Sequence, residues 1–138
     1  MAKWLKIYST EESAYHFDVD GSMKIDSVKI TSWNPENESI DEYVKSDPHP
    51  RPSIRVDKKA TSTTNITNSE LGYLGGGAGK SHGLSYYGGN GSFIRSNNIH
   101  HLEMGFYSDE VTDMLIENNE IHHNEKYGLD PHSVLMIC

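Results

Sequence analysis

Residues 94–101, Ile-Arg-Ser-Asn-Asn-Ile-His-His, decide the fold, because they return 22 positions later as residues 116–123, Ile-Glu-Asn-Asn-Glu-Ile-His-His. Residues 66–71 fit the same template, and residues 25–30 fit it more loosely. A second marker, glycine followed by an apolar residue, recurs at positions 83, 105 and 128. A repeat of this length that contains short strands predicts a solenoid.

The type of solenoid follows from what each repeat contains. The leucine pattern of leucine-rich repeats is absent, and no repeat carries a helical period. Short apolar alternations, β-branched residues and Asn-containing turns instead predict a parallel β-helix, an all-β fold. Its coils stack about 4.8 Å apart, so equivalent positions form ladders. The alignment predicts a polar turn ladder of Asn119, Asn97 and Ser69, and a buried apolar ladder of Ile121, Ile99 and Leu71.

Composition limits the function classes. The chain has 138 residues, a formal charge of −8 and 35% hydrophobic residues. This length suits one domain with a modest core, and the acidic charge argues against general nucleic-acid binding, which needs a basic face. No segment approaches the roughly 20 apolar residues of a membrane span. The single cysteine, Cys138, excludes an intrachain disulfide or a Cys-based zinc site.

We expect one β-helix domain over residues 1–138, with an N-terminal lead-in at 1–22 and an inter-coil loop at 34–52. That loop holds four of the five prolines and a run of acids. The glycine-rich stretch at 75–79 with Lys80 imitates a phosphate-binding loop, but its first glycine is replaced by Leu74 and the strand-to-helix context is missing. The coils at 83–138 carry the expected active face.

Alternation along the three glycine-marked strands predicts which side chains share that face. Leu84, Phe106 and Leu129 should point inward. Two outward columns are expected, Ser85 with Tyr107 and Asp130, and Tyr87 with Asp109 and His132, while His82, Met104 and Tyr127 just precede the glycines. Together they predict a surface patch of Tyr87, Tyr107, Asp109, Tyr127, Asp130 and His132. Aromatic rings beside carboxylates and an imidazole suit a sugar-binding groove, because rings stack on the apolar face of a sugar.

The run Tyr127-Gly128-Leu129-Asp130-Pro131-His132 resembles the signature of the mannuronan C5-epimerases, right-handed parallel β-helix enzymes that act on alginate. The resemblance covers roughly residues 20–132 and is sharpest at 121–132. It implies a right-handed parallel β-helix of about five coils, with Tyr127, Asp130 and His132 on the family's catalytic positions. Many members follow the histidine with Asp or Glu, whereas this chain has Ser133.

The chemistry of these residue types fits the reaction independently. The C5 proton of a uronate lies α to a carboxylate, so its removal needs a general base and neutralisation of that carboxylate, and a proton donor on the opposite face inverts the centre. We expect His132 to be the base and Tyr127 the acid, although the reverse assignment stays open. Asp130 would hold one tautomer of His132 or bind the substrate carboxyl as a shared-proton acid.

The expected partner is an anionic polysaccharide, bound by side chains around the motif. The aromatic and acidic candidates are Tyr87, Tyr107 and Asp109, and the candidates for neutralising the carboxylate are Lys80, Lys126, His101 and His123. An acidic protein that binds a polyanion must concentrate its few cations locally. No cofactor and no metal are expected. Calcium stays open in the family, but Asp18, Asp20 and Asp26 lack the spacing of a calcium loop.

Three alternatives remain at this stage. The first is a non-catalytic polysaccharide-binding module or inactive fragment, the second is a polysaccharide lyase, and the third is a purely structural solenoid. Compared with the family it is C-terminally shortened, and its apolar end, residues 134–138, predicts homo-oligomers or aggregates through an uncapped final coil. The resemblance implies an extracellular or cell-surface location, although residues 1–6 have no apolar run typical of a secretory signal.

Overall fold

In the computed structural model the chain is an all-β solenoid-like stack of short parallel strands, in which residues 3–9, 15–42, 50–76 and 82–133 are described. These residues form no helix, and every pairing between named strands is parallel. The described part of the chain therefore contains no helix that could cross a membrane. Parallel pairing without helical crossovers confirms the predicted stacking of β-coils.

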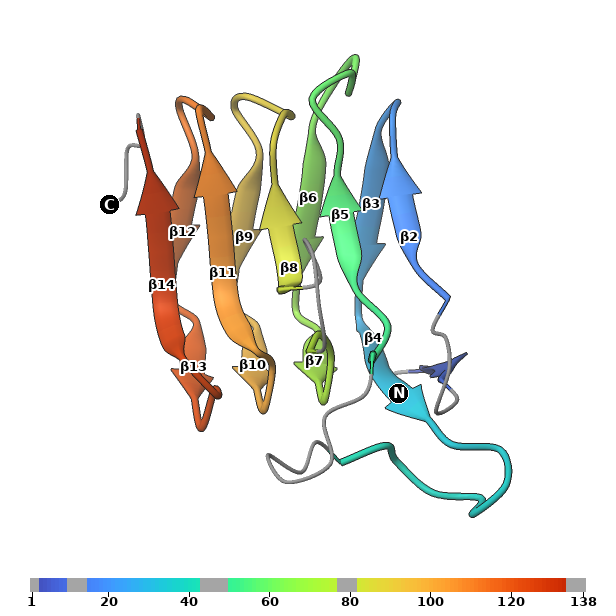
Figure 1. Cartoon of the computed structure of the whole chain (residues 1–138). Helices are drawn as coiled ribbons and strands as arrows, with labels where there is room; N and C mark the ends of the chain where they lie inside the picture. Colours follow the sequence, from blue (N-terminus) through green and yellow to red (C-terminus); the bar gives the residue numbers. More distant parts are fainter. Residues whose placement is uncertain (1–2, 10–14, 43–49, 77–81, 134–138) are drawn as a thin grey trace.

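Three sheets run side by side along the stack (Figure 1). The basal sheet contains, in spatial order, β1 (Lys3–Tyr8), β4 (Val28–Trp33), β7 (Glu70–Gly72), β10 (Asn98–His100) and β13 (Glu120–His122). The front sheet contains β14 (Tyr127–His132), β11 (Met104–Asp109), β8 (Gly83–Tyr86), β5 (Ile54–Val56) and β2 (Phe17–Val19). The rear sheet contains β12 (Leu115–Glu117), β9 (Phe93–Arg95), β6 (Thr64–Thr67) and β3 (Met23–Asp26).

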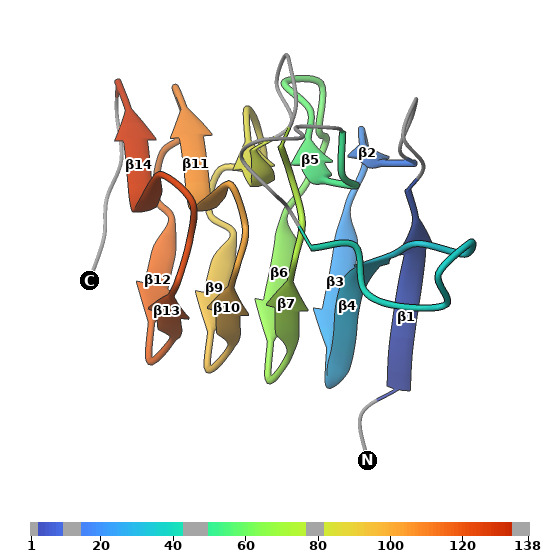
Figure 2. The same cartoon turned by 60° about the horizontal axis from the view of Figure 1, so that its bottom comes forward.

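The predicted apolar ladder is confirmed by the strand register. Ile99 pairs with Leu71 on one side and with Ile121 on the other, and both Ile99 and Leu71 are fully buried. Figure 2 shows the strands of the three sheets stacked coil upon coil, and each sheet contributes such a ladder to the core. The hydrophobic core thus consists mainly of stacked β-branched and leucine side chains, as a β-coil repeat requires.

The predicted polar ladder is also confirmed, at the turn between the rear and basal sheets. Oδ1 of Asn119 accepts from the backbone N–H of Asn97 at 2.9 Å, and Oδ1 of Asn97 accepts from the N–H of Ser69 at 2.9 Å. The hydroxyl of Ser69 continues the series by accepting from the N–H of Val28 at 3.2 Å. Each side chain therefore satisfies a turn N–H of the coil before it, which fixes the stacking of the coils.

Of the expected inward side chains on the front sheet, Leu84 and Phe106 are fully buried. Leu129 pairs with Phe106 but is 41% exposed. The reason is its position on β14, the outermost strand of the front sheet in the described chain. The expected dimer contact through residues 134–138 lies outside the described residues.

Two N-terminal segments, the expected lead-in at 1–22 and the expected inter-coil loop at 34–52, are attached to the stack of coils. The lead-in at 1–22 carries β1 and β2, which pair with β4 and β5 and so belong to the solenoid. The loop at 34–52 is anchored at its end by Arg51, which is buried and donates from Nε to the carbonyl of Gly75 at 2.7 Å and from Nη2 to that of His101 at 3.1 Å. A guanidinium that binds the carbonyls of two later coils holds this segment against the stack.

Candidate active site

The outer face of the front sheet brings the predicted residues into register. Asp130 on β14 lies opposite Tyr107 on β11, and His132 lies opposite Asp109. Tyr107 in turn pairs with Ser85 on β8. Ser85 lies in the expected column but is fully buried. The columns predicted from alternation are therefore present, with aromatic, acidic and imidazole groups on neighbouring strands.

A β-bulge decides where Tyr127 points. Tyr127 and Asp130 are three residues apart, so a regular strand would place them on opposite faces. The register of β11 against β8 shifts between Met104 and Tyr107, and β14 follows β11 because Met104 pairs with Tyr127. One extra residue in a strand re-aims the side chains before it. From this shift we infer that Tyr127, 58% exposed, shares the outer face with Asp130.

The glycine that the register shift requires is Gly105 of β11, whereas Gly128 of the motif has room for a side-chain carbon. A Cβ on Gly105 would lie 2.7 Å from Cγ2 of Ile121 and 2.7 Å from the carbonyl oxygen of Gly128. A Cβ on Gly128 would meet Cγ2 of Ile121 at 3.6 Å. Ile121 packs against the core, so both glycines turn inward at the bulge. The register also corrects one expected column, because Met104 lies opposite Gly83 and not His82.

His132 and Asp130 form a pair on the outer face of β14. Nε2 of His132 lies 3.2 Å from Oδ1 of Asp130, and the two side chains are 51% and 23% exposed. A carboxylate near Nε2 favours the neutral imidazole tautomer with its proton on Nε2 and its lone pair on Nδ1. The pair is thus arranged to present Nδ1 as a base.

Tyr107 is the centre of the aromatic cluster on this face. Its ring centroid lies 5.1 Å from that of His132, 4.3 Å from that of His82 and 5.7 Å from that of Tyr87. Desolvation, followed by the charges of Asp109 and Asp130, raises the pKa of Tyr107. Tyr107 therefore stays a neutral phenol, suited to contact a sugar ring and to donate a hydrogen bond.

Ser133 takes a defined place beside Asp109. Its hydroxyl donates to Oδ1 of Asp109 at 3.2 Å, from a residue with a positive φ of 67° just after β14. Many mannuronan epimerases have a carboxylate after the motif histidine. Here a carboxylate comes from the preceding coil instead, because Asp109 on β11 is directly opposite His132 on β14.

Lys126 stands next to Tyr127 and belongs to a small charged group. Its Nζ lies 3.6 Å from Oε1 of Glu103, which also lies 3.2 Å from Nδ1 of His82. Glu103 is buried, whereas Lys126 is 60% exposed. The lysine is therefore positioned at the Tyr127 end of the strand with its ammonium group accessible. Lys80, the other lysine of the predicted set, lies outside the described residues.

His101 and His123 are not on the outer face of the front sheet. They lie at the corner between the basal and front sheets, in a stack in which Tyr73 and His101 have ring centroids 4.6 Å apart and His101 and His123 5.4 Å apart. Desolvation and then the neighbouring histidines, first His100, lower the pKa of His101. The recurrence of the His pairs thus produces ring stacking in a turn ladder. Within the described ranges no group of three or more His, Cys, Asp or Glu is arranged to hold a metal.

Arg55 is the functional candidate that the sequence did not reveal. Arg55 on β5 is paired with Ser85 on β8, which is paired with Tyr107 on β11, so it belongs to the same column. Its Nε lies 3.5 Å from Oδ1 of Asp18. Nε is buried, without a hydrogen-bond partner of suitable geometry in the described part of the chain. A cavity of about 220 Å³ adjoins it and is lined by Arg55, Asp57, Lys58, Tyr87, Asp109 and Glu110.

Comparisons with known protein families, with characterised proteins and with solved structures find no match for this chain. The family to which the motif points is therefore a prediction.

Proposed function

We propose that this protein is a right-handed parallel β-helix enzyme of the mannuronan C5-epimerase type, which inverts C5 of mannuronate residues within an alginate-like polymer. The observation that carries the proposal is the bulge at Gly105 and Gly128. It gives Tyr127, Asp130 and His132 a common face despite their odd spacing. Bulges often re-aim side chains beside active sites.

The base and the acid stand at opposite ends of one strand. Tyr127 and His132 are the first and last residues of β14, so their Cα atoms are at most roughly 16 Å apart at about 3.3 Å per residue. Inversion needs proton removal on one face of the sugar and proton delivery on the other, so the two groups must flank the ring. A pyranose lying over Gly128 and Asp130 would have Nδ1 of His132 on one side and the phenol of Tyr127 on the other.

The proposed reaction consists of proton transfers only, so it needs no oxidant or reductant. Nδ1 of His132 takes the C5 proton, and the electron pair delocalises into the substrate carboxyl group. Tyr127 then returns a proton to C5 from the opposite face, and solvent restores both groups. Asp130 keeps the proton of His132 on Nε2, which orients the base. No organic cofactor is needed for this exchange.

Neutralisation of the substrate carboxylate is assigned to Lys126. It is the cation beside Tyr127, and its Nζ is accessible. Arg55 lies three strands from Asp130 in the same column, about 14 Å at the spacing of parallel strands. A polymer that crosses β14, β11, β8 and β5 along the stack would meet Tyr107 next and Arg55 further on.

The test is the product formed from polymannuronate. Proton NMR that shows new guluronate signals supports the epimerase. Unsaturated ends that absorb in the ultraviolet would identify a lyase, which shares the first proton abstraction. Binding of the polymer without either product would identify a non-catalytic module.

A further inference from the structure

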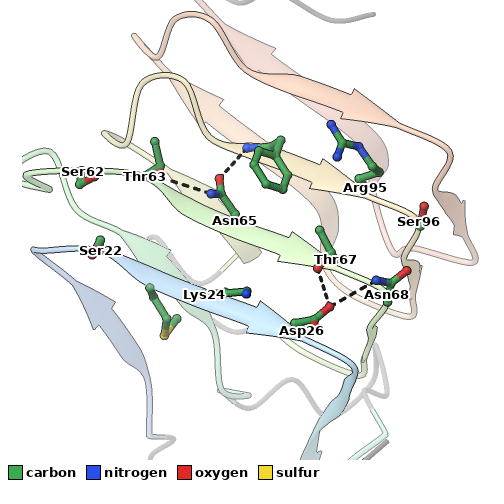
Figure 3. Close-up of a pocket in the computed structure, with 12 residues that line it drawn as sticks. Ser22, Lys24, Asp26, Ser62, Thr63, Asn65, Thr67, Asn68, Arg95 and Ser96 are labelled. Atoms are coloured by element: carbon green, nitrogen blue, oxygen red, sulfur yellow. Dashed lines mark hydrogen bonds between the residues drawn. The ribbon is translucent and has the colours of Figure 1, made fainter.

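The outer face of the rear sheet carries a second polar hollow, separate from the front-sheet site. It has a volume of about 540 Å³ and extends over β3, β6 and β9. Figure 3 shows its side chains standing on the outer face of these three strands. The candidate active site uses none of them.

Two side-chain ladders form the floor of this hollow. Asp26 pairs with Thr67, Thr67 with Arg95, and Arg95 with Glu117. The second ladder lies beside the first. It begins at Lys24, which pairs with Asn65, and continues to Phe93 on β9. The surface thus combines hydroxyls, an amide, a phenyl ring and charges of both signs.

The carboxylates of this face are already engaged. Oδ1 of Asp26 accepts from Oγ1 of Thr67 at 2.7 Å and from Nδ2 of Asn68 at 3.3 Å (Figure 3). These hydrogen bonds, that from Thr67 first, lower the pKa of Asp26. Oε1 of Glu117 accepts from Nε of Arg95 at 2.6 Å. The carboxylates of Asp26 and Glu117 therefore already have hydrogen-bond donors from the same sheet and its turns.

The groups of this face that can still bind a ligand are hydrogen-bond donors. Within the described ranges, the terminal guanidinium nitrogens of Arg95 make no hydrogen bond, and the ammonium of Lys24 faces Asp26 only through space. In a chain with a formal charge of −8, two accessible cations in one hollow select an anion. The charge of the hollow is thus complementary to carboxylates.

The remaining lining suits a sugar. Phe93 is half-buried, with Cζ of Arg95 4.8 Å from its ring centroid, and leaves part of the ring for stacking. Asn65 is fixed by its bonds to the N–H of Phe93, 2.9 Å, and to Oγ1 of Thr63, 3.4 Å. Side chains that are held in place before binding lose little entropy on contact with hydroxyl groups.

We propose that this hollow is an accessory binding site for a carboxylate-bearing oligosaccharide segment. Lys24 and Arg95 would bind two of its carboxylates, and Phe93 would stack on an intervening ring. The two cations stand on the strands that flank β6, about 10 Å apart across the sheet. Alternate residues of an extended β-linked uronan present carboxylates on the same side. The identity of the polymer rests on the proposed function, whereas the site itself does not.

The experiment is a titration of the ¹⁵N-labelled protein with a mannuronate hexamer, followed by NMR. Backbone amides of β3, β6 and β9 should shift. The double variant Lys24→Gln/Arg95→Gln should weaken the Kd reported by these amides at least fivefold. The matched control Lys3→Gln/Lys59→Gln removes the same charge from exposed positions outside the hollow and should leave that Kd unchanged.

A third variant tests the role of the acid beside the hollow. Glu117→Gln removes the negative charge next to Nε of Arg95, so the hexamer should bind more tightly. A neutral mannose hexamer should bind the wild-type hollow at least fivefold more weakly than the uronate. Equal binding of the two hexamers, or a Kd unaffected by the double variant, overturns the proposal.

The same titration separates this site from the proposed enzyme. Shifts confined to β11 and β14 overturn the accessory site and leave the epimerase standing. Shifts confined to the rear sheet, with no turnover of polymannuronate, support the accessory site and overturn the epimerase. If no amide shifts, both proposals are wrong.

Discussion

Oδ1 of Asp130 lies 3.2 Å from Nε2 of His132, two residues further along the same strand. Side chains two residues apart share one face of a strand, so the pair needs no contribution from another coil. The carboxylate favours the imidazole tautomer with its proton on Nε2. In the proposed mechanism His132 is therefore prepared to act as the base before a substrate arrives.

Replacing Asp130 with Asn should reduce the rate of epimerisation by about 10²-fold or more. The amide can donate to Nε2 and so favours the tautomer with the proton on Nδ1, where the base must have its lone pair. Stability should change by less than about 1 kcal/mol, because the pair is partly exposed and no hydrogen bond joins its two side chains. Initial rates by NMR and thermal unfolding measure the two effects. An unchanged rate would remove Asp130 from the mechanism.

Gly105→Ala should destabilise the fold by about 2 kcal/mol, because its Cβ would lie 2.7 Å from Cγ2 of Ile121 and must displace β14 or the core. Gly128→Ala is the matched variant. Its Cβ would have an ordinary contact of 3.6 Å, so stability should be unchanged or slightly raised. Urea unfolding measures both. Equal losses would mean that the bulge is not packed as described.

Asn97→Ala should lower the free energy of unfolding by about 2–3 kcal/mol. The buried amide accepts from the N–H of Ser69 and donates to the carbonyl of Ile66, each at 2.9 Å, so the substitution leaves two turn groups without partners. Asn37→Ala, on an exposed turn, serves as the control and should have little effect. Losses of similar size in both variants would argue against the polar ladder.

The stability of the fold should decrease as pH falls below about 6.5. The pKa of His101 is lowered in the folded state from its ordinary value of 6.5. The unfolded chain therefore binds the proton more readily, and unfolding becomes easier as pH drops from 6.5 through the folded pKa. His101→Asn, which tolerates the positive φ of 55°, should flatten this dependence. Urea titrations between pH 7.5 and 5 test it, and an identical slope in the variant would contradict it.

The stacking could be predicted from the sequence because the last two repeats have the same length. Ile99 and Ile121 share a 22-residue spacing, and their ladder is present. Arg55 could not be found in this way, because its coil is longer than the 22-residue repeat. The connections between β5 and β8 place Ile54 opposite Leu84, 30 positions later, and therefore Arg55 opposite Ser85. The surface patch predicted from the sequence includes Tyr127, but the register shift beside it required the structure, since only the pairing with β8 reveals it.

The deuterium content at C5 after incubation of polymannuronate in deuterated water tests the central claim most directly. The wild-type protein should produce guluronate that carries deuterium at C5. His132→Ala should abolish both exchange and inversion, whereas Tyr127→Phe should still release the C5 proton but form guluronate at least about 10²-fold more slowly. Exchange and inversion at wild-type rates in His132→Ala, or neither in the wild-type protein, would contradict the assignment of the front sheet as an epimerase site.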